Sequence, residues 1–169
     1  VSIAILNFSS TSIASTIVMW NEIDFVDSLH GCAVGTWVQS EFMGVIATTA
    51  DGGKSWSAWA SDTIPLMSSV RFINSTTIIA SGKDGCLLRS GDEGMSWVRM
   101  IPKKNNNASK VSILPDGTIS VIGGNRACYS RDGGLTWSVD STNKQFSTIV
   151  FTDTMHGISA GGVLSSTNR

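Results

Sequence analysis

The stretch SRDGGLTW, residues 130–137, is one of three similar octapeptides in the chain. The other two are TADGGKSW, residues 49–56, and SGDEGMSW, residues 90–97. Aligned on their aspartates at positions 51, 92 and 132, the three copies lie 41 and 40 residues apart. A regular spacing of this length indicates that the chain is built from repeated structural units.

The flanks of the octapeptides repeat as well, which indicates what each unit contains. Two short apolar strands precede the strand that enters each octapeptide, and its tryptophan opens a fourth strand. Positions alternate with a period of two, and no stretch has a sustained helical period. The sequence therefore predicts an all-β chain, a β-propeller of four-stranded antiparallel blades. We expect about three and a half blades, at residues 21–66, 67–107, 108–146 and a truncated 147–169, after a leading segment 1–20 that is a strand or the end of a preceding blade. Because the last copy stops within a repeat, we expect a fragment or a degenerate final unit.

The octapeptide contains residue types that stabilise a tight turn. Its aspartate can accept hydrogen bonds from the backbone of its own turn, and its leading hydroxyl can add another. The glycine permits a positive φ, and the tryptophan can pack on the adjoining strand. Three equal copies favour a structural role over catalysis or the binding of calcium or another ligand. The residues assigned to these turns are Thr49, Asp51, Gly53, Trp56, Ser90, Asp92, Gly94, Trp97, Ser130, Asp132, Gly134 and Trp137.

Composition excludes several classes of function. With 169 residues and a net charge of −1, the chain has no basic field for nucleic acid. Residues 1–20 carry no charge, but Ser, Thr and Asn interrupt every apolar run, so we expect neither a signal peptide nor a membrane span. The three cysteines form no metal-binding pair, and the sequence leaves one disulfide open. We expect no cofactor and no metal.

The octapeptide resembles the Asp-box, or bacterial neuraminidase, repeat, and the wider repeat narrows the resemblance. IDFVDSLHGCAVG, residues 23–35, together with GVIATTADGGKSW, residues 44–56, is similar to the blade of the photosystem II stability and assembly factors. IVFTDTMHGISAGG, residues 149–162, repeats its first half. The resemblance implies a non-catalytic scaffold that binds a protein partner, such as an unassembled membrane-protein subunit, in the thylakoid lumen, the periplasm or outside the cell.

A glycoside hydrolase of the sialidase or xyloglucanase type is the alternative. A sialidase needs an arginine cluster and a nucleophilic tyrosine with a carboxylate partner. The one tyrosine, Tyr129, lies on a strand whose equivalents carry Arg89 and Thr48, so we expect the catalytic residues of such an enzyme outside this chain. The two histidines, His30 and His156, occur in equivalent Asp-x-x-His-Gly turns and are interpreted as turn residues.

One insertion is the best candidate for a functional surface. The connection GTWVQSEFMG, residues 35–44, is about seven residues longer than its equivalent in the second repeat. Insertions between repeats lie on one face of such folds, which is often the binding face. We therefore expect Trp37, Glu41 and Phe42 to contact a partner, although a local hydrophobic plug explains this composition equally well.

Overall fold

The computed structural model of the chain describes residues 17–38, 41–61, 63–100, 110–123, 126–141, 146–151, 156–161 and 165–168. Side chains are described up to residue 139, apart from those of residues 61 and 126. The described residues form strands and one short 3-10 turn, η1 (Lys83–Gly85). The all-β prediction is therefore confirmed.

The strands form four antiparallel sheets in sequence order, three with four strands and one with three. In every sheet each strand pairs with the next strand of the chain, which is the meander of a propeller blade. Blade 1 contains β1 (Ile17–Phe25), β2 (Gly31–Val38), β3 (Phe42–Thr49) and β4 (Ser57–Ser61). Blade 2 contains β5 (Met67–Phe72), β6 (Ile78–Gly82), β7 (Leu87–Ser90) and β8 (Val98–Met100). Blade 3 contains β9 (Lys110–Ile113), β10 (Ile119–Gly123), β11 (Arg126–Ser130) and β12 (Ser138–Ser141), and the last sheet contains β13 (Phe146–Phe151), β14 (His156–Gly161) and β15 (Ser165–Asn168).

Two of the sheets begin before the repeat boundaries expected from the sequence. β1 begins at Ile17, four residues before the expected start of the first repeat at residue 21, and continues without interruption to Phe25. β13 begins at Phe146, one residue before the expected start of the last repeat.

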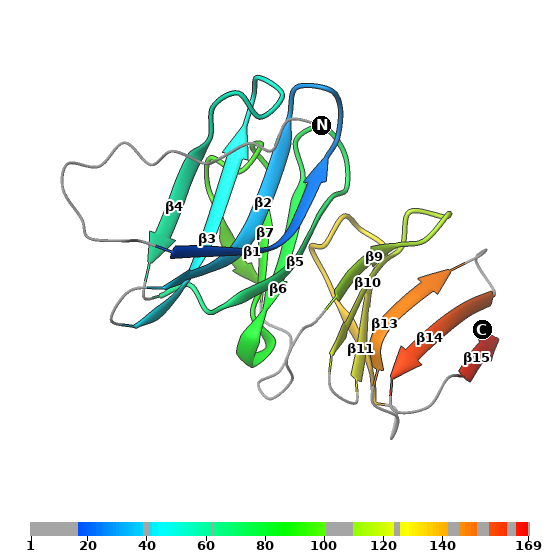
Figure 1. Cartoon of the computed structure of the whole chain (residues 1–169). Helices are drawn as coiled ribbons and strands as arrows, with labels where there is room; N and C mark the ends of the chain where they lie inside the picture. Colours follow the sequence, from blue (N-terminus) through cyan, green and yellow to red (C-terminus); the bar gives the residue numbers. More distant parts are fainter. Residues whose placement is uncertain are drawn as a thin grey trace.

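The sheets are stacked through their first strands, as Figure 1 shows from blue to red. β1 contacts β5, β5 contacts β9, and β9 contacts β13. The first strands therefore form a row along one edge of the stack, and the outer strands β4, β8 and β12 lie farther from it. The first strands of neighbouring blades face each other across a seam, and these seams carry much of the chemistry described below.

The middle strands are apolar on both faces because neighbouring blades cover them. One core cluster joins blades 1 and 2 through Val34, Ile46, Met67, Ile78 and Leu88, and a second joins blades 2 and 3. Burial of this surface is the main source of cohesion between blades, since such burial contributes about 25 cal/mol per Å². The sequence did not exclude one disulfide bond. In the structure the three cysteines, Cys32, Cys86 and Cys128, are all free thiols.

Candidate functional site

Each octapeptide forms a turn that its own side chains close. In the first, Thr49 Oγ1 accepts a hydrogen bond from Gly53 N at 2.9 Å and donates one to Asp51 Oδ1 at 2.8 Å. Asp51 in turn accepts from Ser55 N at 2.9 Å and from Ser55 Oγ at 2.6 Å. A side-chain network of this kind fixes both arms of the turn at once.

The same network recurs in the other two copies. Gly94 N donates to Ser90 Oγ at 2.8 Å, and Gly134 N donates to Ser130 Oγ at 2.8 Å. In each copy the aspartate also accepts from the serine or threonine four residues later. We call the three turns box 1, box 2 and box 3, for residues 49–56, 90–97 and 130–137.

The aspartates of the boxes are held in the charged form. Hydrogen bonds from the side chain and backbone of Ser55, and from Thr49, lower the pKa of Asp51 to about 2. The pKa values of Asp92 and Asp132 are lowered for the same reason, with Ser96 and Thr136 as the main donors. A permanently ionised carboxylate is a good hydrogen-bond acceptor for a turn and a poor general acid.

The tryptophans fold back onto the boxes. Trp56, Trp97 and Trp137 are half-buried, and each indole Nε1 donates to the carbonyl of the box glycine three residues before it. Trp97 packs against the core between blades 1 and 2, and Trp56 meets Phe25 edge-on at a centroid distance of 6.1 Å. The rings therefore connect each box to its sheet.

Boxes 2 and 3 also contact the preceding blade. A Cβ atom on Gly94, where φ is +88°, would lie 2.5 Å from Thr48 Cγ2 on β3 of blade 1. One on Gly134 would lie 2.7 Å from Ile79 Cδ1 on blade 2, and Arg89 Nε donates to Gly133 O at 2.8 Å. These glycines are needed for close approach between blades as well as for the turn.

A polar network that was not predicted from the sequence lies at the seam between the first strands. Glu22 on β1 accepts hydrogen bonds from Ser69 Oγ and, at 3.0 Å, from Val70 N, and it pairs with Lys110 and, at 2.8 Å, with Arg71. Burial opposes the ionisation of Glu22, but the hydrogen bonds from Lys110, Ser69 and Val70 and the charge of Arg71 lower its pKa below the usual value.

The seam follows a rule that the strand registers reveal. Glu22, Ser69 and Lys110 occupy equivalent positions in blades 1, 2 and 3, because each lies opposite the second-strand residue that precedes a glycine: Gly35, Gly82 and Gly123. Glu22 and Asp24 accept from Val70 N and Phe72 N of the next blade, and Ser69 accepts from Val111 N of the third. Side chains of one blade thus satisfy backbone donors on the edge of the next. The sequence feature that could have indicated the seam is a polar residue that alternates with apolar residues in a first strand.

His30 lies in the turn before β2, and its side chain is described by the structure. Asp27 Oδ1 accepts from Leu29 N and His30 N, both at 2.7 Å, and His30 Nδ1 contacts Asp27 Oδ2 at 2.8 Å. The backbone donors at His30 and Leu29, together with the His30 ring, lower the pKa of Asp27 to about 2. Asp27 raises the pKa of His30. The side chain of His156 and all of Asp153 lie outside the described residues.

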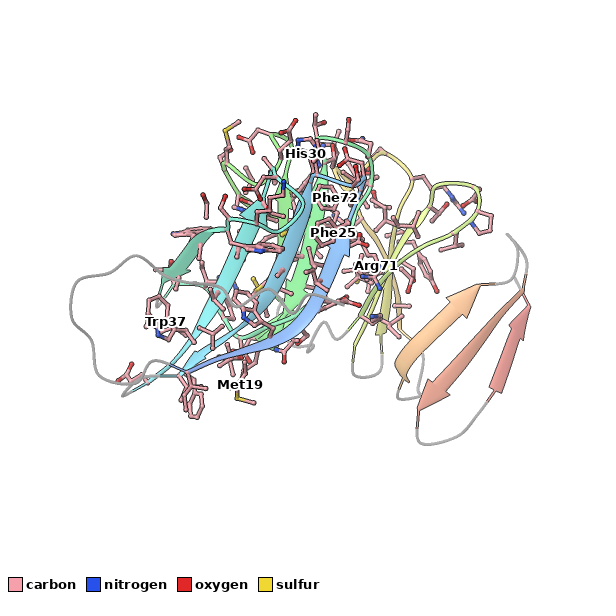
Figure 2. All side chains as sticks on the ribbon, turned by 45° about the horizontal axis from the view of Figure 1, so that its top comes forward. Met19, Phe25, His30, Trp37, Arg71 and Phe72 are labelled. Carbon is pink, nitrogen blue, oxygen red and sulfur yellow. The ribbon has the colours of Figure 1, made fainter. Side chains whose placement is uncertain are left out.

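The insertion forms the far end of a longer hairpin. β2 and β3 remain paired out to Val38 and Phe42, beyond the point where the equivalent pair in blade 2 ends. Phe42 is 67% exposed, Glu41 is exposed, and Trp37 is half-buried. Figure 2 shows Trp37 at the opposite end of blade 1 from His30. The structure thus groups Trp37, Glu41 and Phe42 at one end, and the boxes at the other.

The described residues contain no group of three or more His, Cys, Asp or Glu side chains that could hold a metal ion. In the part of the chain that the structure describes, no helix has the length and apolar character to cross a membrane.

Comparison with known proteins shows which repeat family the boxes resemble. A family model described as "BNR/Asp-box repeat" matches residues 129–139, which contain box 3. No curated protein matches the chain by sequence.

Solved structures share the fold. The structure titled "YCF48 bound to D1 peptide" matches with a TM-score of 0.63 and 17% identity, over 92% of this chain and 56% of that one. YCF48 from Cyanidioschyzon merolae matches with a TM-score of 0.59 and 17% identity, over 93% and 58% of the two chains. A GH74 enzyme from Niastella koreensis matches with a TM-score of 0.62 and 14% identity, over 87% of this chain and 28% of the enzyme.

This chain therefore spans little more than half of either YCF48 chain and less than a third of the enzyme. The identities are low, so the matches show the fold. Repeat motif and fold agree with the resemblance drawn from the sequence: the chain is a set of Asp-box β-propeller blades resembling those of YCF48.

Proposed function

We propose that these blades belong to a non-catalytic scaffold that binds a protein partner. The observation that carries the proposal is the match, over 92% of this chain, to YCF48 bound to a D1 peptide. YCF48 is a photosystem II assembly factor, and in that structure it is bound to a peptide. By this analogy the partner is an unassembled membrane-protein subunit met on the extracytoplasmic side, in the thylakoid lumen or periplasm.

The β2–β3 hairpin supplies the contact surface in this proposal. Its tip presents an aromatic ring, Phe42, which is 67% exposed, next to the carboxylate of Glu41. Exposed aromatic residues are costly in water and are enriched among the residues that dominate binding energy. Trp37 lies half-buried on the strand behind the tip, paired with Met43.

The state of the carboxylates supports a non-catalytic role. A glycoside hydrolase needs a carboxyl group whose pKa is raised, so that it can act as an acid near neutral pH. Wherever a described Asp or Glu has a resolved shift, the pKa is lowered: at Glu22, Asp27, Asp51, Asp92, Asp116 and Asp132. These carboxylates serve turns and ion pairs.

A GH74-type glycoside hydrolase is the second candidate, and the match to the Niastella koreensis enzyme favours it. Such an enzyme would draw its catalytic carboxylates from blades beyond this chain. Release of reducing sugar from xyloglucan, or hydrolysis of a fluorogenic sialoside, by a protein that contains this chain together with such further blades would establish the enzyme and overturn the scaffold proposal.

The direct test is binding of the fluorescent D1 peptide that YCF48 binds, followed by anisotropy. We expect saturable binding that Phe42→Ala weakens about tenfold, or about 1.4 kcal/mol, with no change in the unfolding midpoint. Val98→Ala is the matched control, because Val98 is 62% exposed on an outer strand. Absence of binding, or equal losses in the two variants, would contradict the proposal.

A further inference from the structure

A hollow of about 190 Å³ opens between box 1 and box 2, at the end of the blades opposite the β2–β3 hairpin. Blade 1 contributes His30, Thr49 and Ser57 to its wall, and blade 2 contributes Phe72, Glu93 and Met95. In Figure 2 the labelled His30 and Phe72 lie close together at the end of the blades away from Trp37. The hollow thus combines acceptor groups with apolar walls, and residues of two neighbouring blades form it.

Glu93 is in an unusual conformation. Its φ is +61°, and the equivalent residues of boxes 1 and 3 are Gly52 and Gly133, with φ of +74° and +69°. Glycine adopts this conformation without strain, whereas a residue with a side chain does so at a cost. Turn stability therefore favours glycine, and box 2 carries a carboxylate instead at the wall of the hollow.

The charges around the hollow favour a cation. Glu93 and Asp27 are both close enough to His30 to interact with its charge. His30 Nδ1 lies 2.8 Å from Asp27 Oδ2, so the neutral ring carries its proton on Nδ1, and its Nε2 is an acceptor. Glu93, with its carboxylate, and His30, with its imidazole acceptor, line a space that is also walled by Phe72 and by Met95, which is 83% exposed.

We propose that this hollow binds a basic side chain, lysine or arginine, of a partner polypeptide. The cationic group would pair with Glu93, and the aliphatic stem would pack on Phe72 and Met95, as long basic side chains pack on apolar surface. A metal ion fits less well, since the described residues contain no group of three metal-ligating side chains here. The inference deepens the proposed scaffold function by adding a second contact, distant from the hairpin.

The probe is an acetylated, amidated Gly-Gly-Lys-Gly-Gly peptide, with arginine and norleucine versions alongside. Norleucine keeps an unbranched aliphatic stem and removes the charge. Amide signals of ¹⁵N-labelled protein report binding at Gly31, Thr49 and Glu93. We expect saturable shifts with the lysine or arginine peptide and at least tenfold weaker binding of norleucine. Equal affinities of all three peptides would overturn the proposal.

The decisive variant is Glu93→Gly, which removes the carboxylate and restores the residue type of the other two boxes. We expect binding to weaken at least tenfold while the unfolding midpoint rises by about 2 °C, because the strain is relieved. Asp84→Gly is the matched control: Asp84 is also an exposed acidic residue at positive φ, 59°, but lies in η1 between β6 and β7. It should leave peptide binding unchanged. Unaltered binding in Glu93→Gly would contradict the assignment.

The pH dependence of peptide binding is an independent test of the proposed cation site. A cation bound beside His30 should bind more weakly as the pH falls through the pKa of His30, because the protonated ring repels it. His30→Gln should remove that dependence. Stronger binding in acid would indicate an anion site and refute the proposal. Because these assays use model peptides, their failure leaves the D1-peptide test of the hairpin unaffected.

Discussion

The boxes and the seam positions on the first strands differ in how they repeat from blade to blade. The boxes use nearly the same residues three times, and in each the leading hydroxyl accepts a hydrogen bond from the N–H of the glycine four residues later. The seam positions on the first strands are equally well aligned, yet they hold glutamate, serine and lysine in turn. A box closes a turn within its own blade, so the same residues can form it in every copy. A seam position must match its neighbour, so each junction has its own residues.

The seam gives the largest expected effect. Glu22→Ala leaves Arg71 and Lys110 without their carboxylate, and Val70 N without its acceptor. We expect a loss of about 3 kcal/mol in the free energy of unfolding, at the lower end of the range for buried ion pairs that lose one partner, because Arg71 and Lys110 are partly exposed. Urea unfolding measures it. Glu41→Ala, at an exposed carboxylate, should change stability by less than about 0.5 kcal/mol. Similar small effects of both changes would show that the seam contributes little.

Trp97 tests the contribution of a box to the core. Replacing it with alanine removes a half-buried ring from the core between blades 1 and 2, together with its hydrogen bond to Gly94 O. We expect a cost of about 2–3 kcal/mol, at or below the range for fully buried aromatics. Thermal or urea unfolding will measure the change. A loss of partner binding without a loss of stability would instead mark the box as a binding site.

Two glycines separate turn strain from contact between blades. Gly94→Ala adds both the strain of φ +88° and a clash with Thr48, whereas Gly133→Ala adds strain at φ +69° with no atom within 4 Å. We expect losses of about 2 and about 1 kcal/mol respectively. Equal losses would show that box 2 makes no close contact with blade 1.

Acid should weaken the boxes within a defined range of pH. The pKa of Asp51 is about 2 in the folded protein, compared with 3.8 for an ordinary aspartate. Its contribution to stability is therefore complete above pH 4 and is lost as the pH falls through 2. Urea midpoints measured from pH 5 to pH 2 should decline less steeply in Asp51→Asn. Identical slopes in the two proteins would contradict a role for the charged form.

The sequence predicts the blades well because the repeat is local. Each box and its strands fall within about 40 residues, and period-two alternation indicates the strands directly. The seam could not be predicted, because Glu22 and Lys110 are 88 residues apart and only folding brings them together. The hollow depends on the φ of Glu93 and on contact between blades. The one sign of the hollow in the sequence was a glutamate, Glu93, at a position where the other two boxes have glycine.

The most direct test of the boxes as repeated structural locks is the free energy of unfolding of three equivalent variants, Asp51→Ala, Asp92→Ala and Asp132→Ala. Each aspartate accepts a hydrogen bond from the backbone N–H of the serine or threonine four residues later, so urea unfolding should show a comparable loss in all three. A variant whose stability is unchanged or increased would contradict the account, since residues kept for a ligand are often kept at a cost to stability.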